Sequence, residues 1–444
     1  MTAIDELYLV QNGVDDVVDT DHNTLVDAVL FQNDAFGGTY NYGNGRDGNL
    51  KMGAISPNAT TAPTVIAGVA GSLTGTFYYK YSVYNLSGET TVSSASSAVA
   101  PSAQKVTVTI PAFANNTNVT GFYLYRSADN VTYYRVAFIP VDDATDGATY
   151  VDNLPITSGT APQGSNTTGT SVTTGGTFYA KSVSIPTGTI TLASSLPYLV
   201  ILCQGDVTFG GTISGAGVWT ANSIPEYTAQ ATNQPSSAST KGINSSIVST
   251  YGSGSRIFLN TTQLQSSNSR WIFKQGSGGA GGVGDGKAGG TVFIAAKGAL
   301  NVSTGTITLN GANGGASQAD GGGAGGICVL SSSTYINRTG VTISANGGNG
   351  STGTNGTVPG ASGGGGGIVV FISDYIIGSA TVSVNGGSAG AANPSAGGSS
   401  YGAVGGGCGG DGGLQISTTQ TPNAGSAGIS LDTTPRATSL PRLG

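Results

Sequence analysis

Residues 325–332 read GGICVLSS, and residues 340–347 read GVTISANG. The first stretch is a short apolar run opened by paired glycines, which is typical of a strand buried on both faces. The second alternates apolar and polar side chains, which is typical of a strand buried on one face. The same pair of stretches begins at residues 289 and 305, and again at residues 366 and 379. This repeated pair of strands predicts an all-β fold.

The paired glycines that open these units occur at residues 289, 325, 366 and 412, at intervals of 36, 41 and 46 residues. A fourth unit begins as GGLQIS at residues 412–417 and then stops. Neither strand can bury its apolar face alone, so the units are predicted to stack as a glycine-rich β-solenoid-like repeat. Runs such as Gly363 to Gly367 leave an alternative open, a bundle of polyproline-II-like glycine helices.

The composition limits the functions that the chain can have. Glycine supplies 75 of the 444 residues, and 47 of these glycines lie between Gly276 and Gly428. Charged residues are only 9% of the chain, against roughly 25% in ordinary globular domains. With 16 Lys and Arg against 22 Asp and Glu, the net charge is −6, which argues against nucleic-acid binding. Hydrophobic residues at 38% argue against simple disorder.

The region from residue 62 to about 155 has a different pattern. Segments 77–83, 105–110, 121–126 and 133–138 alternate apolar and polar residues, with turn residues between them. Short strands at this spacing predict an antiparallel β-sandwich. Its tyrosines are predicted to pack inside the sandwich; a sugar-binding platform is the less favoured reading.

The N-terminal region contains the only predicted helix, at residues 20–31, with Thr20 and Asp21 as candidate N-caps. Its apolar stripe is too short to fold alone, so we expect it to pack against copies of itself in a homotrimer or against a docking partner. The glycine-rich cluster at residues 43–48 is predicted to be a tight turn. The candidate oligomerisation residues, which follow helical spacing, are Leu25, Val26, Val29 and Leu30.

These patterns divide the chain into five parts. Residues 1–60 form an N-terminal attachment and oligomerisation segment, and residues 61–157 form the sandwich. Residues 166–275 are a β-rich lead-in, residues 276–430 are the glycine-rich repeat domain, and residues 431–444 are an extended tail.

No catalytic, metal or cofactor site is predicted. His22 is the only histidine, which removes most Ser-His, Cys-His and His-metal chemistry. The three cysteines, Cys203, Cys328 and Cys408, lie far apart without paired spacing, and the first two fall in apolar strands where burial is expected. No secretory signal and no membrane-spanning apolar run are expected.

Several stretches carry a family resemblance. Residues 7–30 (LYLVQNGVDDVVDTDHNTLVDAVL) and 41–52 (NYGNGRDGNLKM), with TISANGGNG and GGGGGIVVF in the repeats, resemble glycine-rich tail-fibre, spike or head-fibre proteins of tailed bacteriophages. Residues 121–137 (GFYLYRSADNVTYYRVA) and 150–155 (YVDNLP) resemble fibronectin type III-like modules of phage and bacterial surface proteins. The phage resemblance implies a homotrimer attached by its N-terminus to other virion proteins, with the C-terminus facing the host.

The expected function is therefore that of a non-enzymatic virion fibre or adhesin, made in the host cytoplasm and exposed on the particle. The loops at residues 312–323, 349–365 and 388–410 differ in length between units, so they are the expected contact face for a host-surface glycan. Asn393 and Tyr401 are the candidate receptor-contact residues. The alternatives are an architectural head fibre or capsid decoration protein, a polysaccharide-degrading spike with paired carboxylates, and a bacterial surface adhesin.

Overall fold

The computed structural model describes residues 42, 44–56, 59–114, 117–142, 144–155, 158–218, 286–315, 320–352, 360–391 and 423–433. Over these ranges the chain is built from β-strands, with one 3₁₀ turn, η1 (Ala144–Asp146), and no α-helix. The all-β prediction is confirmed for these residues. The predicted helix at residues 20–31, including Leu25, Val26, Val29 and Leu30, lies outside the described residues.

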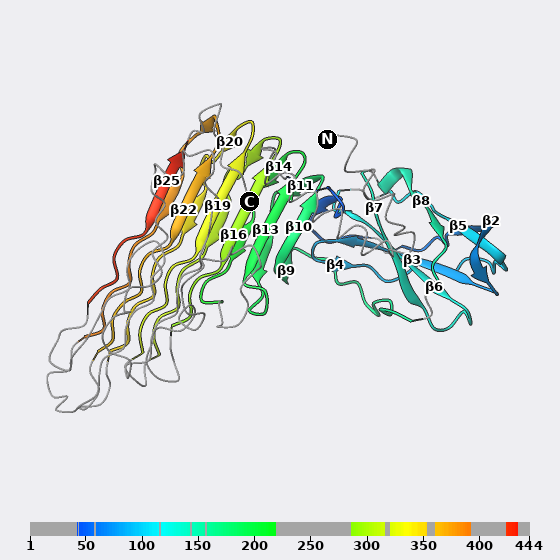
Figure 1. The fold of residues 1–444 in the computed structure, drawn as a ribbon, viewed down its shortest axis with the longest axis horizontal. Helices are drawn as coiled ribbons and strands as arrows, with labels where there is room; N and C mark the ends of the chain where they lie inside the picture. The colour runs from blue at the N-terminus through cyan, green and yellow to red at the C-terminus, as the bar shows by residue number, and fades with distance from the viewer. Residues whose placement is uncertain are drawn as a thin grey trace, which may run out of the picture.

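The N-terminal half of the described chain contains two antiparallel sheets (Figure 1). The first sheet has the order β2-β5-β8 and the second has the order β4-β3-β6-β7. Their shared core includes Leu73 and Val106 from the first sheet and Leu124 and Val136 from the second. The strands are β2 (Thr64–Thr74), β3 (Tyr78–Asn85), β4 (Gly88–Glu89), β5 (Ser102–Ile110), β6 (Gly121–Ser127), β7 (Tyr134–Pro140) and β8 (Ala148–Asp152).

The alternation predicted for residues 77–83 is confirmed in β3. Tyr79, Tyr81 and Val83 are buried in the core, each no more than 1% exposed. The Tyr81 ring meets the Phe122 ring edge to face, with 5.7 Å between the ring centroids. These tyrosines therefore serve packing, and they are not accessible as a sugar platform.

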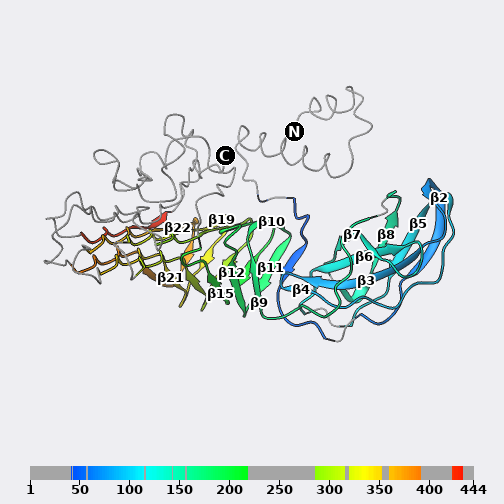
Figure 2. The same ribbon diagram turned by 90° about the horizontal axis from the view of Figure 1, so that it is seen from below.

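The rest of the described chain forms three six-stranded parallel sheets, which it visits in turn (Figures 1 and 2). Sheet 1 contains β10 (Gly176–Ala180), β13 (Tyr198–Cys203), β16 (Thr291–Ala296), β19 (Ile327–Ser332), β22 (Ile368–Ile372) and β25 (Ile429–Thr433). Sheet 2 contains β1 (Asn49–Lys51), β11 (Ser182–Ile185), β14 (Val207–Phe209), β17 (Leu300–Asn301), β20 (Ile336–Asn337) and β23 (Ile376–Ile377). Sheet 3 contains β9 (Ser171–Thr174), β12 (Thr189–Leu192), β15 (Thr212–Ser214), β18 (Thr306–Thr308), β21 (Thr342–Ser344) and β24 (Thr381–Ser383).

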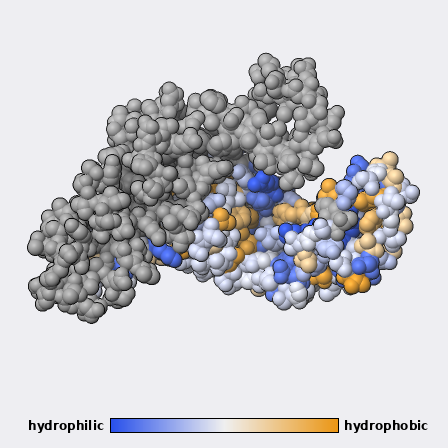
Figure 3. Space-filling model, turned by 60° about the horizontal axis from the view of Figure 1, so that its bottom comes forward, coloured by the Kyte–Doolittle hydropathy of each residue, from blue (hydrophilic) through white to orange (hydrophobic). Residues whose placement is uncertain are grey.

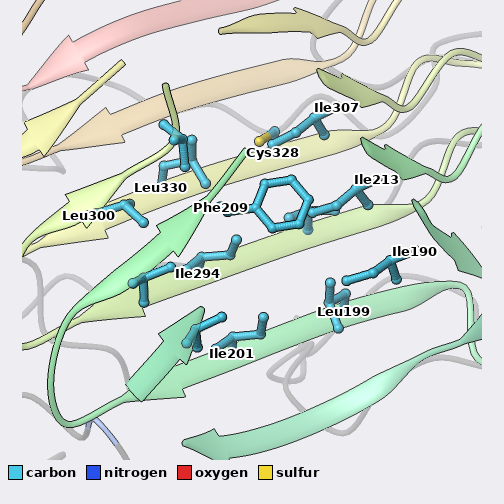
Figure 4. Close-up of a cluster of buried hydrophobic side chains, with 14 of the residues drawn as sticks. Ile190, Leu199, Ile201, Phe209, Ile213, Ile294, Leu300, Ile307, Cys328 and Leu330 are labelled. Carbon is cyan, nitrogen blue, oxygen red and sulfur yellow. The ribbon is translucent and has the colours of Figure 1, made fainter. Parts of the chain in front are cut away.

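The three sheets enclose one apolar core (Figure 4). Because the strands are parallel and in register, equivalent side chains stack in columns along the core. In sheet 3 the column is a run of four isoleucines, each no more than 1% exposed, and in sheet 2 it is a run of aliphatic residues. The sheet 3 column is Ile190, Ile213, Ile307 and Ile343, and the sheet 2 column is Leu50, Val183, Val207, Leu300 and Ile336.

Strand β1 precedes the antiparallel sheets in sequence but pairs with β11 in sheet 2. The antiparallel unit is therefore inserted between the first two strands of sheet 2. Backbone hydrogen bonds hold both of its connections, from Leu86 N–H to the Lys51 carbonyl and from Thr167 N–H to the Glu89 carbonyl. The Ile55 N–H also donates to Thr168 Oγ1 at 2.9 Å. The two parts of the molecule meet across a junction that both crossings of the chain stabilise.

The structure adds three details to the predicted repeat. Each unit has a third strand of two residues, β17, β20 or β23, which the sequence pattern did not predict. The strand that pairs with β22 is β25, at residues 429–433, whereas the sequence placed the fourth unit at residues 412–417. Strands on both sides of residue 276 belong to the same three sheets, so no break in the sheets occurs there.

Candidate functional site: the glycine-rich limbs

The loops expected to form the contact face begin as extended limbs beyond sheets 1 and 3. An outgoing limb follows each of β18, β21 and β24, over residues 309–315, 345–352 and 384–391. A returning limb precedes each of β16, β19, β22 and β25, over residues 286–290, 320–326, 360–367 and 423–428. Figure 1 shows these limbs running side by side beyond the ends of the arrows.

The limbs are joined by backbone hydrogen bonds that recur every three residues. Gly347 and Gly350 donate to the next outgoing limb, at Asn385 and Ser388. Gly348 donates to a returning limb instead, at the Gly323 carbonyl, over 2.8 Å. A three-residue period is that of a polyproline II helix, which makes no internal hydrogen bonds and so offers its backbone groups to neighbours. Each limb is thus bonded to limbs on more than one side.

Close backbone approach explains why these limbs are made of glycine. A Cβ atom built on Gly348, Gly364 or Gly387 would overlap with the carbonyl oxygen of a neighbouring limb. In contrast, the limb glycines at described positions do not have positive φ; from residue 286 onward, positive-φ glycines occur among described residues only at Gly340 and Gly378, in turns between strands. Glycine therefore serves close backbone approach in the limbs, and not chain reversal at positive φ.

Side-chain ladders run along the outgoing limbs, perpendicular to the chain. The Asn313 Oδ1 accepts from the Asn349 N–H, and the Asn349 Oδ1 accepts from the Ser388 N–H, both at 2.8 Å. All three of these side chains are exposed. A second ladder, closer to the strands, joins Asn310 to Asn346 and Asn346 to Asn385 in the same way.

The exposed ladder was not predicted from the sequence, although a signal was present. Each outgoing limb carries a polar residue three positions after the Asn of its Asn-Gly pair, at 313, 349 and 388. This spacing equals the three-residue period of the limb, so both polar residues lie on one side of it. The ladder presents amide and hydroxyl groups without charge, which are groups suited to hydrogen bonding with hydroxyl-rich ligands.

The predicted receptor-contact residues, Asn393 and Tyr401, lie outside the described residues. The structure describes only the limbs that lead to their loop, ending at Ala391 and resuming at Asn423. Within the limbs, Asp320 is fully buried. Its N–H donates to Ser351 Oγ at 2.8 Å, and its carbonyl accepts from the Ser351 N–H. The described limbs that lead to these loops are therefore packed against one another.

The antiparallel unit carries a second surface of note. On the outer face of its β2-β5-β8 sheet, Ile66, Thr107 and Val151 lie opposite one another in register. Ile66 is 70% exposed and Val151 is 51% exposed. Figure 3 shows hydrophobic residues scattered among weakly polar ones on the described surface.

Three further observations concern the described residues. Cys203 and Cys328 are both buried free thiols, as predicted, and burial raises their pKa values to about 11 and about 12. Within the described ranges, no group of three or more His, Cys, Asp or Glu side chains is arranged to hold a metal ion. Over the same residues, no helix has the length and apolar character needed to cross a membrane.

Comparisons of the chain with protein-family models, with curated proteins and with solved structures found no match. The proposals that follow therefore depend on the sequence and on the geometry described above.

Proposed function

We propose that this chain is a structural fibre or adhesin subunit of a tailed-phage particle. It is attached through its N-terminal part, and it presents the loops at the ends of its glycine-rich limbs to a glycan on the host surface. The observation that carries the proposal is the three-residue hydrogen-bonding period of the limbs, because it gives loops of unequal length a common rigid support.

The proposal includes a finer description of the fold. The three parallel sheets form a β-solenoid-like stack, and the limbs continue it as a bundle of polyglycine-II-like helices. The two readings that the sequence set against each other thus apply to successive stretches of each unit. The antiparallel unit is a fibronectin type III-like module that acts as a spacer between the attachment site and the stack.

Glycan recognition is supported by the chemistry of the limbs. Their exposed ladder, Asn313, Asn349 and Ser388, contains amide and hydroxyl groups and no charged group. These groups form hydrogen bonds with sugar hydroxyls without the cost of removing a charge from water. In this proposal the protein has no catalytic role, acts as a homotrimer on the virion, and binds neither nucleic acid nor membrane.

The test is adsorption of particles that carry a deletion of residues 393–402, which removes Asn393 and Tyr401 and keeps the described limbs. We expect adsorption to fall while the purified variant retains the circular dichroism spectrum and melting temperature of the wild type. Asn393→Ala and Tyr401→Ala, made singly, then show which side chain contributes.

Normal adsorption of the deletion particles would contradict the adhesin proposal. Labelling of the protein on intact particles then separates the alternatives, because an architectural head fibre or decoration protein lies on the capsid. The homotrimer is tested separately by light scattering, where a mass near 43.7 kDa for the isolated chain would argue against it.

A further inference from the structure

Sheet 1 is apolar on both of its faces. Its inward side chains, such as Ile294, Leu330 and Phe371, belong to the core that all three sheets share. Its outward side chains form a separate cluster that contains no residue of sheets 2 or 3. We call this cluster the outer face of sheet 1: Leu202, Phe293, Ala295, Ile327, Val329, Ile368, Val370 and Ile372, with Val200 and Leu431 at its margins.

The outer face is an ordered surface of stacked rows. One row runs from Val200 through Phe293, Val329 and Val370 to Leu431, each residue paired in register with the next. A second row contains Ile327 and Ile368. The face spans four strand spacings, or about 19 Å.

This face is buried although the described elements do little to cover it. Val329 is 1% exposed, Val370 is fully buried, and Phe293 is 8% exposed. Among the described residues, the cluster gains only Tyr42, Ala288 and Ala324 from outside the strands of sheet 1. The described residues thus leave most of these rows without a covering element, so the face needs a cover from another part of the molecule.

Tyr42 indicates which part that is. It is the first described residue, it belongs to the outer-face cluster, and residues 1–41 lead directly into it. The N-terminal segment is therefore tethered at the surface that needs a cover. Its predicted helix, residues 20–31, would be about 18 Å long, which matches most of the width of the face.

The character of the segment fits the surface. Its stripe of Leu25, Val26, Val29 and Leu30 supplies an apolar side. Residues 1–41 also contain eight Asp or Glu residues and no Lys or Arg. The exposed Lys287, four residues before β16, carries the opposite charge.

We propose that the N-terminal segment, residues 1–41, docks through this apolar stripe on the outer face of sheet 1 of its own chain. The stripe is then buried within one chain, so trimer formation and attachment to the particle must both use other surfaces. This inference is independent of the proposed virion function, since it concerns only how the chain covers itself.

The test places the photo-reactive residue p-benzoylphenylalanine at position 26 of the full-length protein. After irradiation, we expect a cross-linked product of monomer mass whose cross-linked peptides contain β16, β19 or β22. The control carries the same group at position 131, because Val131 is 81% exposed in the antiparallel unit. That control should give no cross-link to sheet 1.

A second variant combines the position 26 probe with Val329→Asp, and we expect loss of the cross-link to β19. Cross-links that form only between chains would show that the segment covers a second copy, and would overturn the proposal. Cross-links to other elements, or none, would also overturn it. If the Val329→Asp variant does not fold, the mapping with the single probe decides the question.

Discussion

Arg338 and Asp432, which are 94 residues apart in sequence, are joined by two parallel hydrogen bonds of 2.5 and 2.7 Å at the C-terminal end of the parallel stack. Asp432 is paired in register with Phe371, the last aromatic side chain of its inward row in sheet 1. The Arg338 guanidinium lies over that ring, 4.6 Å from its centroid. The arginine therefore covers the buried Phe371 ring and pairs with the carboxylate on the neighbouring strand, β25.

Replacement of this arginine tests the capping role. We expect Arg338→Ala to destabilise the stack by about 1 kcal/mol, because it loses a bidentate ion pair and a cation–π contact. Thermal unfolding followed by circular dichroism measures the effect. The exposed Lys297→Ala is the control, and equal melting temperatures for the two variants would contradict the prediction.

Gly364 tests the role of close approach in the limbs. A Cβ at this position would overlap with the carbonyl oxygen of Gly323, while the Gly364 N–H donates to Gly348. We expect Gly364→Ala to lower the free energy of unfolding by about 2–3 kcal/mol, because the neighbouring limbs must move apart. The control is Gly164→Ala, whose added methyl group meets nothing within 4 Å. Equal stability of the two variants in urea would disprove the packing argument.

Asp152 tests the buried ion pair of the antiparallel unit. Its carboxylate accepts from Arg126 at 2.8 Å and from the Tyr79 hydroxyl at 2.9 Å, and it is fully buried. We expect Asp152→Asn to lower the free energy of unfolding by about 3 kcal/mol, because it leaves the charge of Arg126 buried without a carboxylate partner.

The matched control for this variant is Asp142→Asn. Asp142 pairs with Lys181 at 3.1 Å, but its side chain is 71% exposed, so the loss should be below about 0.5 kcal/mol. Urea unfolding of both variants gives the comparison. If Asp142→Asn lowered the free energy of unfolding as much as Asp152→Asn, burial would not determine how much each ion pair contributes to stability.

Tyr81 gives the molecule a predictable response to high pH. Burial raises the pKa of its phenol from 10.0 to about 12, since the charged form is poorly solvated in the core. Its neutral form therefore contributes stability below pH 10 that is lost as the pH rises from 10 toward 12.

At pH 8 we expect Tyr81→Phe to have the same free energy of unfolding as the wild type. Between pH 10 and 12 this free energy should fall by up to about 2–3 kcal/mol less in the variant than in the wild type. Urea unfolding across this pH range measures the difference. Parallel curves for the two proteins would mean that Tyr81 does not contribute to alkaline unfolding.

The sequence predicted the longest buried strands correctly. The apolar stretches that follow the paired glycines at residues 289, 325 and 366 coincide with β16, β19 and β22, because a strand buried on both faces is mostly apolar along its length. The two-residue strands β17, β20 and β23 were missed, since two residues show no periodicity.

The pairing of strands that are far apart in the sequence could not be predicted either. Nothing in residues 49–51 indicates a partner beyond an inserted unit, and only the register with β11 reveals it. At the candidate site, the polar ladder of Asn313, Asn349 and Ser388 was not predicted, because its spacing matches neither the two-residue period of a strand nor the 3.6-residue period of an α-helix. The period of the limbs is three.

The early position of β1 has a consequence for the synthesis of the protein. The strand leaves the ribosome well before its partner, since Asn49 and Ser182, whose side chains are hydrogen-bonded, are 133 residues apart. At translation rates of 5–20 residues per second, β1 waits roughly ten seconds for β11. The antiparallel unit, whose strands all lie in the interval, emerges complete during that time. It can therefore fold first and bring together the two segments that flank it, which carry β1 and β11, before the parallel stack begins to grow.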